Sequence, residues 1–271
     1  MANDDLLNDK IQSMQNEIIE ITKYWRYIWR DIFTNGISNS PYSEALFVFL
    51  SSLFIKARQT IPCGSILYRA RIMSEEDIIE SNNRILNNPN TSFKGFDAAN
   101  SFIPPINNIC AGRVNEQFVP CLYAAENYET AQVEVRSKSN DTISIAQIKV
   151  NSQILLADTC NLQSNKSGEL YYRLLLTRIF SQPVKDKNDY LFSQYAGLLL
   201  KRNGFDGIRY ASSFIENGHN IAIFNPDKCA PVNSDRYIVE KTNQEPKDIE
   251  NILGEIYPCL ERCITEQFKQ M

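Results

Sequence analysis

Apolar residues recur at alternating spacings of three and four along residues 4–33 of the chain. This period places them on one side of an α-helix, so the pattern predicts a long helix that ends before Asn35-Gly36. Ser40-Pro41 then begins a second apolar stripe with residue types that suit the first turn of a helix. We therefore expect an N-terminal helical hairpin, which packs either within its own chain or as a coiled coil between two chains.

Shorter apolar segments follow, and turn residues separate them. The patterns predict strands at residues 65–71, 121–125, 143–150, 154–158 and 220–224, and helices at 128–136, 168–180 and 190–202. Residues 81–90 are rich in asparagine and predict a loop or the frayed end of a helix. The mixture of strands and helices indicates an α+β fold, and helical patterns return after residue 247.

These patterns divide the chain into three parts. A helical N-terminal domain is expected over residues 1–60, a mixed α+β domain over 61–235 and a helical tail over 236–271. The turn-forming sequence Pro62-Cys63-Gly64 marks the first boundary. A chain of 271 residues is long enough for this division.

Charge and cysteine usage argue against several classes of protein. The net charge of −4 disfavours a protein dedicated to nucleic acid, which would carry a basic excess. The most apolar run, residues 45–55, is too short to cross a bilayer, so we expect no membrane contact. The polar N-terminus has no secretory signal, and the seven cysteines form no CxxC motif. We expect reduced thiols in a cytoplasmic protein without a metal site.

Residues 110–136 contain the densest group of candidate functional side chains. A Gly-Arg-x-Asn turn at residues 112–115 leads into the predicted strand that contains Tyr123, and the helix after it contains Glu134. Glu134 lies off the apolar stripe of this helix and is expected to point toward a cleft. The stretch thus predicts a pocket that Arg113, Tyr123 and Glu134 all reach.

Several short motifs occur in a fixed order over residues 64–232. They are Leu67-Tyr68-Arg69-Ala70-Arg71, Gly112-Arg113-Val114-Asn115, Leu122-Tyr123-Ala124-Ala125, Gly204-Phe205-Asp206-Gly207-Ile208 and Tyr210-Ala211-Ser212-Ser213. In this order they resemble the RES family of NAD-consuming domains, which have an ADP-ribosyltransferase-like fold and are best known as toxins of bacterial toxin–antitoxin pairs. The family is named for an Arg, a Glu and a Ser, and the matching positions are Arg69, Glu134 and Ser212, with Ser213 as the rival serine.

The resemblance implies that NAD is the substrate. Loss of nicotinamide leaves positive charge on the ribose, and a fixed carboxylate such as Glu134 stabilises that charge. Arginine binds a pyrophosphate through a bidentate fork, and the candidates are Arg69, Arg71 and Arg113. The alternative for Glu134 is a solvated glutamate on the surface of a helix. The alternative for the three arginines is salt bridges at the ends of strands.

Two more side chains belong to the expected site. Tyr123 stacks on nicotinamide or adenine, or donates its hydroxyl to the ligand, unless it is a core tyrosine of the sheet. Ser212 bonds the nicotinamide amide or a phosphate, unless it is a turn serine. No GxGxxG or Walker A motif is present, so a Rossmann or P-loop site is not supported.

These residues do not identify the acceptor of the ADP-ribosyl group, which is phosphate, water or a protein side chain. The resemblance implies a growth-arresting toxin or defence effector with an antitoxin or regulatory protein as partner. The alternative is a protein of another functional class, a non-catalytic module that binds a nucleotide or a protein. The hairpin resembles the HEPN-type domain fused to some RES domains, but it contains no histidine. We expect it to be an association or regulatory element, with a homodimer favoured.

Overall fold

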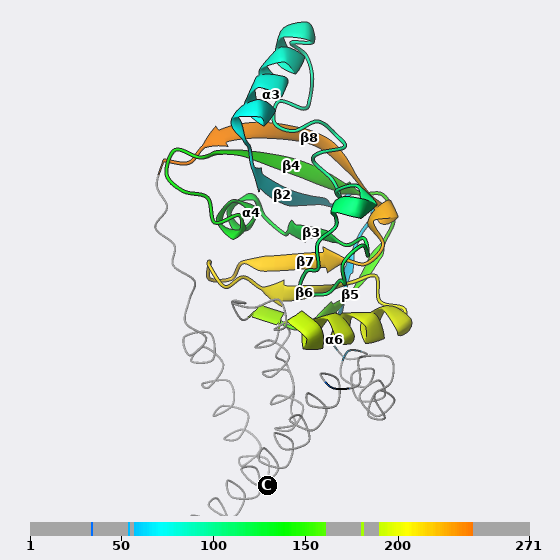
Figure 1. The fold of residues 1–271 in the computed structure, drawn as a ribbon. Helices are drawn as coiled ribbons and strands as arrows, with labels where there is room; N and C mark the ends of the chain where they lie inside the picture. Colours follow the sequence, from blue (N-terminus) through cyan, green and yellow to red (C-terminus); the bar gives the residue numbers. More distant parts are fainter. Residues whose placement is uncertain (1–33, 35–53, 55–56, 161–179, 182–189, 241–271) are drawn as a thin grey trace, which may run out of the picture.

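The computed structural model describes residues 34, 54, 57–160, 180–181 and 190–240 (Figure 1). Most of the predicted N-terminal hairpin, most of the predicted helix at 168–180 and the predicted C-terminal helices lie outside these residues. Thr34 and Phe54 are helical. The ring of Phe54 packs edge to face on Phe205, with 6.2 Å between the ring centroids, so this position of the predicted hairpin contacts the α+β domain of its own chain.

The described residues form one mixed sheet of eight strands in the order β1-β5-β6-β7-β3-β2-β4-β8 (Figure 1). The strands are β1 (Arg58–Ile61), β2 (Ile66–Ile72), β3 (Leu122–Ala125), β4 (Thr142–Val150), β5 (Ile154–Asp158), β6 (Gly207–Ala211), β7 (His219–Ile223) and β8 (Cys229–Ile238). β5 and β6 run parallel, and every other neighbouring pair is antiparallel. The predicted α+β class is therefore confirmed. β1 begins before the predicted domain boundary at residue 61, and β8 ends after the predicted boundary at residue 235.

Three helices accompany the sheet in the described part of the chain: α3 (Glu75–Asn87), α4 (Tyr128–Glu134) and α6 (Leu191–Arg202). Two short 3₁₀ turns, η2 (Ile106–Asn108) and η4 (Pro226–Lys228), lie in connections. None of the described helices is long and apolar enough to cross a bilayer.

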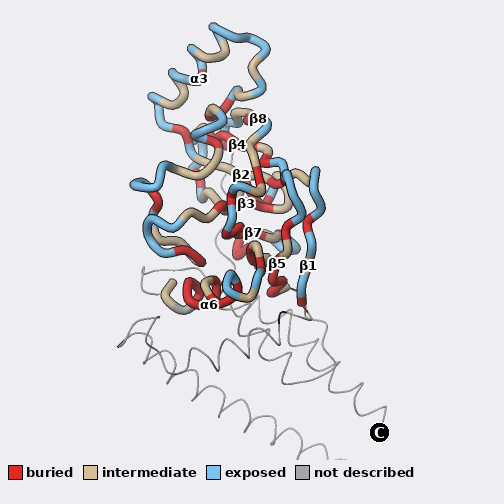
Figure 2. The backbone as a smooth tube through the Cα atoms, turned by 90° about the vertical axis from the view of Figure 1, so that its right-hand side faces the viewer, coloured by how far each residue is buried: buried red, intermediate tan, exposed pale blue. Residues whose placement is uncertain are grey.

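α4 and α6 cover the same face of the sheet. Val135, the C-cap of α4, and Tyr68 of β2 join one apolar cluster, and Leu199 of α6 and Ala222 of β7 join another. The register of β2, β3 and β7 puts Tyr68 and Ala222 on one face, because side chains alternate along a strand. Figure 2 shows the inner side of α6 as buried.

The opposite face of the sheet carries a third apolar cluster, with Phe102 and Ile103 packed against it. Its members include Leu67, Leu122, Ile148, Leu156 and Ile221. The sheet thus has a buried core on both faces.

α3 overlaps a stretch, residues 81–90, for which the sequence predicted a loop or the frayed end of a helix. Ser74 caps it with a capping box: its hydroxyl accepts from the N–H of Asp77, and the Asp77 carboxylate accepts from the N–H of Ser74. The helix stands away from the sheet, and Ser81 is its one buried residue (Figure 2). A polar network holds it at that point.

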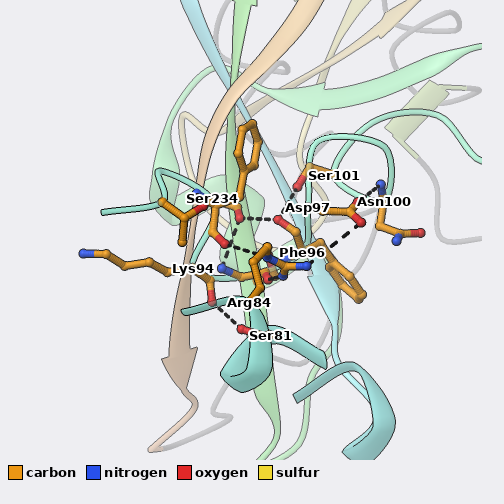
Figure 3. A network of polar contacts seen from close by, with 12 residues as sticks. Ser81, Arg84, Lys94, Phe96, Asp97, Asn100, Ser101 and Ser234 are labelled. Atoms are coloured by element: carbon orange, nitrogen blue, oxygen red, sulfur yellow. Dashed lines mark hydrogen bonds and ion pairs between the residues drawn. The ribbon is translucent and has the colours of Figure 1, made fainter. Parts of the chain in front are cut away.

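Figure 3 shows this network between α3, the segment at residues 93–101 and β8. Arg84 donates to the carbonyls of Phe93 and Gly95, and Ser81 donates to the carbonyl of Lys94. From the other side, Ser234 of β8 donates to the carbonyl of Phe96. The segment is therefore fixed over the face of β2 that carries Arg71.

Candidate active site

A cavity of about 250 Å³ opens where β2 and β3 diverge. The two strands are in register only at Tyr68 and Ala125, whereas β2 pairs with β4 along its whole length. Arg69 and Ala70 follow that single pair on β2, and Tyr123 and Ala124 precede it on β3. All four line the cavity. The separation of two neighbouring strands thus creates the space.

Glu134 reaches this cavity from the last position of α4. Asn127 starts the helix, because its side chain accepts from the N–H of Thr130 over 2.8 Å. Ala131 and Val135, three residues before Glu134 and one after it, line the same cavity. This geometry agrees with the expectation that Glu134 points toward a cleft. The apolar residues Ala131 and Val135 face the same cavity, so Glu134 lies next to the apolar side of the helix.

One oxygen of Glu134 is committed to the protein. Its Oε1 accepts from Oγ of Ser212 and from Nδ2 of Asn220, each over 2.6 Å. Among the described residues, Oε2 has no hydrogen-bond partner. The carboxylate is therefore held in the described structure through one oxygen.

The structure distinguishes the two rival serines. Ser212 is 4% exposed, donates to Glu134, and accepts from the N–H of Phe214 over 3.1 Å. The hydroxyl of Ser213 instead donates to the carbonyl of Ser181. Ser212 is thus the serine that the fold brings to Glu134, and it also acts as the turn serine that the alternative reading proposed.

Tyr123 lines the cavity with its ring, but its hydroxyl is used by the turn at residues 112–115. The hydroxyl donates to Oδ1 of Asn115 over 2.7 Å and accepts from the N–H of Val114 over 2.9 Å. A Cβ at Gly112 would lie 2.6 Å from Asn115 Oδ1 and 2.7 Å from the Tyr123 hydroxyl, so this position requires glycine. The Gly-Arg-x-Asn motif is therefore a clamp that fixes β3.

The same turn is anchored to α6. Gln194 donates to the carbonyls of Gly112 and Asn115, and Ser193 donates to the carbonyl of Arg113 over 2.5 Å. The guanidinium of Arg113 lies 5.6 Å from the ring centroid of Tyr210, which lines the cavity. Arg113 thus borders the cavity, with a cation placed by a rigid turn.

Arg69 lines the cavity, and one of its donors is unsatisfied. The residue is half-buried, yet its Nη1 is fully buried and has no hydrogen-bond partner among the described residues. Burial, and then the charge of Arg71, lower the pKa of Arg69 from 12.5 to about 10. A buried guanidinium without a partner fits an anionic ligand, because such a ligand would restore the solvation that the cation has lost.

Arg71 does not line the cavity. Its Nη1 donates to the carbonyl of Asn100 over 2.5 Å, and its guanidinium lies 4.6 Å from the ring centroid of Phe96. These contacts hold the segment at residues 93–101 on the sheet. Of the three candidate arginines, Arg69 lines the cavity, Arg113 lies over the ring of Tyr210 at its edge, and Arg71 is engaged beside it.

Comparison with known proteins decides the family. A sequence model of the RES domain matches residues 84–240, more than half of the chain. The chain belongs to the RES family. Glu134 and Ser212 lie within the matched span, and Arg69 lies before it, so the place of Arg69 in the site rests on the cavity itself.

Other comparisons give distant or no matches. A chain in the crystal structure of the M. tuberculosis MbcT–MbcA toxin–antitoxin complex matches with a TM-score of 0.38 and 12% sequence identity, over 70% of this chain and 92% of that chain. No curated protein matches the chain.

The RES domain brings two further residues to the cavity that the sequence reading did not select. Asn220 is 6% exposed and contacts Glu134, and Tyr210 is 8% exposed beneath Arg113. The sequence did contain a signal for Asn220, because it is a polar residue next to the apolar run of a predicted strand. Its direction toward Glu134 depends on the pairing of β7 with β3, which no local pattern reveals.

An ion cluster of the RES domain lies next to Asn220 along β7. Arg209 donates to both oxygens of Glu126, over 2.6 and 3.1 Å, and also contacts Asp158. His219 Nδ1 lies 3.2 Å from Glu126 Oε2, so the single histidine of the chain is part of this cluster and not of the cavity. Burial opposes ionisation of Glu126, but hydrogen bonds from His219 and Arg209 outweigh it and lower its pKa from 4.5 to about 2.

Within the described part of the chain, no group of His, Cys, Asp and Glu side chains could hold a metal ion. The five cysteines described there, Cys63, Cys110, Cys121, Cys160 and Cys229, are free thiols.

Proposed function

We propose that this RES domain binds NAD in the cavity between β2 and β3 and cleaves the bond between nicotinamide and ribose. The observation that carries the proposal is Glu134, whose Oε1 is held by Ser212 and Asn220 while Oε2 remains without a partner in the described structure. A fixed carboxylate oxygen beside a cavity suits a reaction that develops positive charge on a sugar.

In the proposed reaction, the C1′–N bond breaks and its electron pair leaves with nicotinamide, which departs as a neutral molecule. The ribose becomes oxocarbenium-like, and Glu134 stabilises it through Oε2 and holds a ribose hydroxyl. A nucleophile then bonds to C1′ and gives up its proton. Phosphate, water and a protein side chain remain the three acceptors, which correspond to phosphorolysis, hydrolysis and ADP-ribosyl transfer.

The size of the cavity supports binding of one end of NAD. A volume of about 250 Å³ is below the roughly 300–1,000 Å³ of pockets that enclose a drug-sized ligand. The nicotinamide–ribose end would occupy the cavity, and the rest of the dinucleotide would extend beyond it. Tyr123 and Tyr210 offer ring surface to the bound end. The hydroxyl of Tyr123 is already engaged, so its proposed role is limited to the ring.

The arginines receive different roles in this proposal. Arg69 and Arg113 contact the pyrophosphate, Arg69 through its unpaired Nη1 and Arg113 from the border of the cavity. Arg71 acts on the site through the charge it places near Arg69 and through the segment at residues 93–101. NAD is a substrate here, and no other cofactor is proposed.

At the level of the cell, we propose a growth-arresting toxin or defence effector that depletes NAD and is restrained by an antitoxin or regulatory protein. The basis is the family, whose members are best known from toxin–antitoxin pairs. Expression of the wild-type chain should stop growth and lower cellular NAD. Expression of a variant without Glu134 should do neither.

The direct test is incubation of the purified full chain with NAD, with and without phosphate, followed by chromatography of the products. Release of nicotinamide supports the proposal, and the second product identifies the acceptor: ADP-ribose with phosphate on the carbon that carried nicotinamide, ADP-ribose itself, or modified protein. The alternative, a non-catalytic module, predicts that NAD binds and is recovered intact. That result, or no binding at all, would refute cleavage as the function.

A further inference from the structure

Two donors from different elements meet at one oxygen of Glu134. Ser212 follows β6, and Asn220 lies within β7, so the carboxylate at the end of α4 is tied to two neighbouring strands. Both contacts are 2.6 Å long, within the range of charge-assisted hydrogen bonds for a hydroxyl and short for an amide. Two donors on one oxygen restrict rotation of the carboxyl group more than either donor would alone.

Asn220 is held in place by the pairing of its strand. Its backbone is paired on both sides, with Tyr210 of β6 and with Ala125 of β3. The residue before it, His219, is fixed by its contact with Glu126. The side chain that touches Glu134 therefore projects from the interior of the sheet, where the backbone has little freedom to move.

The contact also defines which atom of the Asn220 amide faces Glu134. An amide oxygen 2.6 Å from an ionised carboxylate oxygen would be repelled, whereas the amide nitrogen donates a hydrogen bond there. The role of Asn220 toward Glu134 is thus that of a donor.

We propose that Asn220 is the positioning residue of this site: it fixes the plane of the Glu134 carboxylate so that Oε2 faces the ribose carbon of NAD. This inference rests on the proposed function. Asn220 acts through Glu134, and binding of NAD is carried mainly by other residues. Its loss should therefore lower kcat and leave KM nearly unchanged, because misplacement of a reacting group by about 1 Å costs on the order of 100-fold in rate.

The Asn220→Asp variant shows whether Asn220 acts as a hydrogen-bond donor or only fills space. Aspartate has the same shape, but it places an oxygen where the N–H was. We expect kcat for nicotinamide release to fall about 100-fold with little change in KM. Asn220→Ala, which removes the donor without adding charge, should show the same separation of kcat from KM. It serves as the second variant if Asn220→Asp does not fold.

Asn83→Asp is the matched control, because Asn83 is an exposed residue of α3 and the substitution introduces the same charge. It should retain the wild-type kcat and KM. A wild-type kcat in both Asn220 variants would overturn the inference. So would a raised KM with an unchanged kcat, which would make Asn220 a substrate contact instead.

A comparison of melting temperatures tests the contact between Asn220 and Glu134 without a measurement of activity. Glu134→Gln supplies an N–H that can donate to an aspartate at position 220, so Asn220→Asp should lower Tm less in that background than in the wild type. Equal losses of Tm in the two backgrounds would show that the side chains are not coupled and would overturn the inference. If the wild-type protein releases no nicotinamide, the proposed function fails and takes the catalytic part of the inference with it. The Tm comparison still decides whether Asn220 and Glu134 are coupled.

Discussion

The hydroxyl of Tyr123 donates a hydrogen bond to Oδ1 of Asn115 over 2.7 Å, across the turn that precedes β3. Asn115 uses its amide nitrogen for the carbonyls of Cys110, Glu116 and Val119, so the donors of its side chain are all engaged. Burial raises the pKa of Tyr123 well above its usual value, which keeps the hydroxyl protonated and able to donate. A wall of the cavity and the loop outside it are thus one structural unit.

We predict that Tyr123→Phe destabilises the protein while it preserves the ring in the cavity. Oδ1 of Asn115 and the N–H of Val114 would both lose a partner, at a cost of about 1–3 kcal/mol in the free energy of unfolding. Urea denaturation measures this loss. Tyr237→Phe is the matched control, because the Tyr237 residue is 38% exposed and water can replace its hydroxyl contacts. An equal effect of the two substitutions would argue against the clamp.

We predict that Glu134→Gln abolishes NAD cleavage and leaves the fold intact. The glutamine carbonyl can still accept from Ser212 and Asn220, but the negative charge beside the developing cation is lost. Loss of such stabilisation commonly costs about 100-fold or more in kcat. Glu129→Gln is the control, because Glu129 is an exposed glutamate of the same helix. Nicotinamide release by the two variants is the measurement, and an active Glu134→Gln enzyme would remove Glu134 from the mechanism.

We predict that Arg69→Lys impairs NAD use nearly as much as Arg69→Ala. Lysine lacks the bidentate fork, and the burial that lowers the pKa of Arg69 would also disfavour the charge of a lysine. Loss of hydrogen bonds to a charged group corresponds to about 10- to 100-fold in kcat/KM. Arg202→Lys, at the exposed end of α6, is the matched control. Wild-type kinetics in Arg69→Lys would mean that Arg69 supplies charge alone.

Local pattern was sufficient for several elements of the fold, including the helix that carries Glu134. The predicted strand at residues 154–158 matches β5, and the predicted helix at 128–136 matches α4 apart from its last residues. The helix ends early because Val135 is its C-cap and Arg136 adopts a left-handed backbone with φ of 50°. Capping and periodicity are properties of neighbouring residues, so the sequence contains them.

Contacts between distant residues could not be read in this way. Asn115 and Tyr123 were selected as part of a motif, but only the structure shows that they bond to each other and close the turn. Asn220 was missed because its partner, Glu134, lies 86 positions away. α3 was missed in part for a different reason: its asparagines suggested a loop, although the capping pair Ser74 and Asp77 marked a helix start.

The last prediction concerns the acid stability that the Glu126 cluster provides. The pKa of Glu126 is lowered from 4.5 in the unfolded chain to about 2 in the fold, where His219 and Arg209 stabilise the carboxylate against the cost of burial. A depressed carboxyl pKa contributes stability above the unfolded value, and this contribution disappears as the pH falls through the folded value. The ionised Glu126 should therefore stabilise the protein fully above about pH 4.5 and no longer below about pH 2.

Glu126→Gln should accordingly be less stable than the wild type at pH 7, by on the order of 2 kcal/mol, because a partly exposed side chain delivers less than its full shift. The difference in the free energy of unfolding should shrink as the pH falls below 4.5. Urea titrations at a series of pH values measure it, with Glu129→Gln as the exposed control, whose small difference from wild type should not follow this course. A gap between wild type and Glu126→Gln that stays constant down to pH 2 would show that the two arginine contacts of Glu126 act through shape and packing instead of charge.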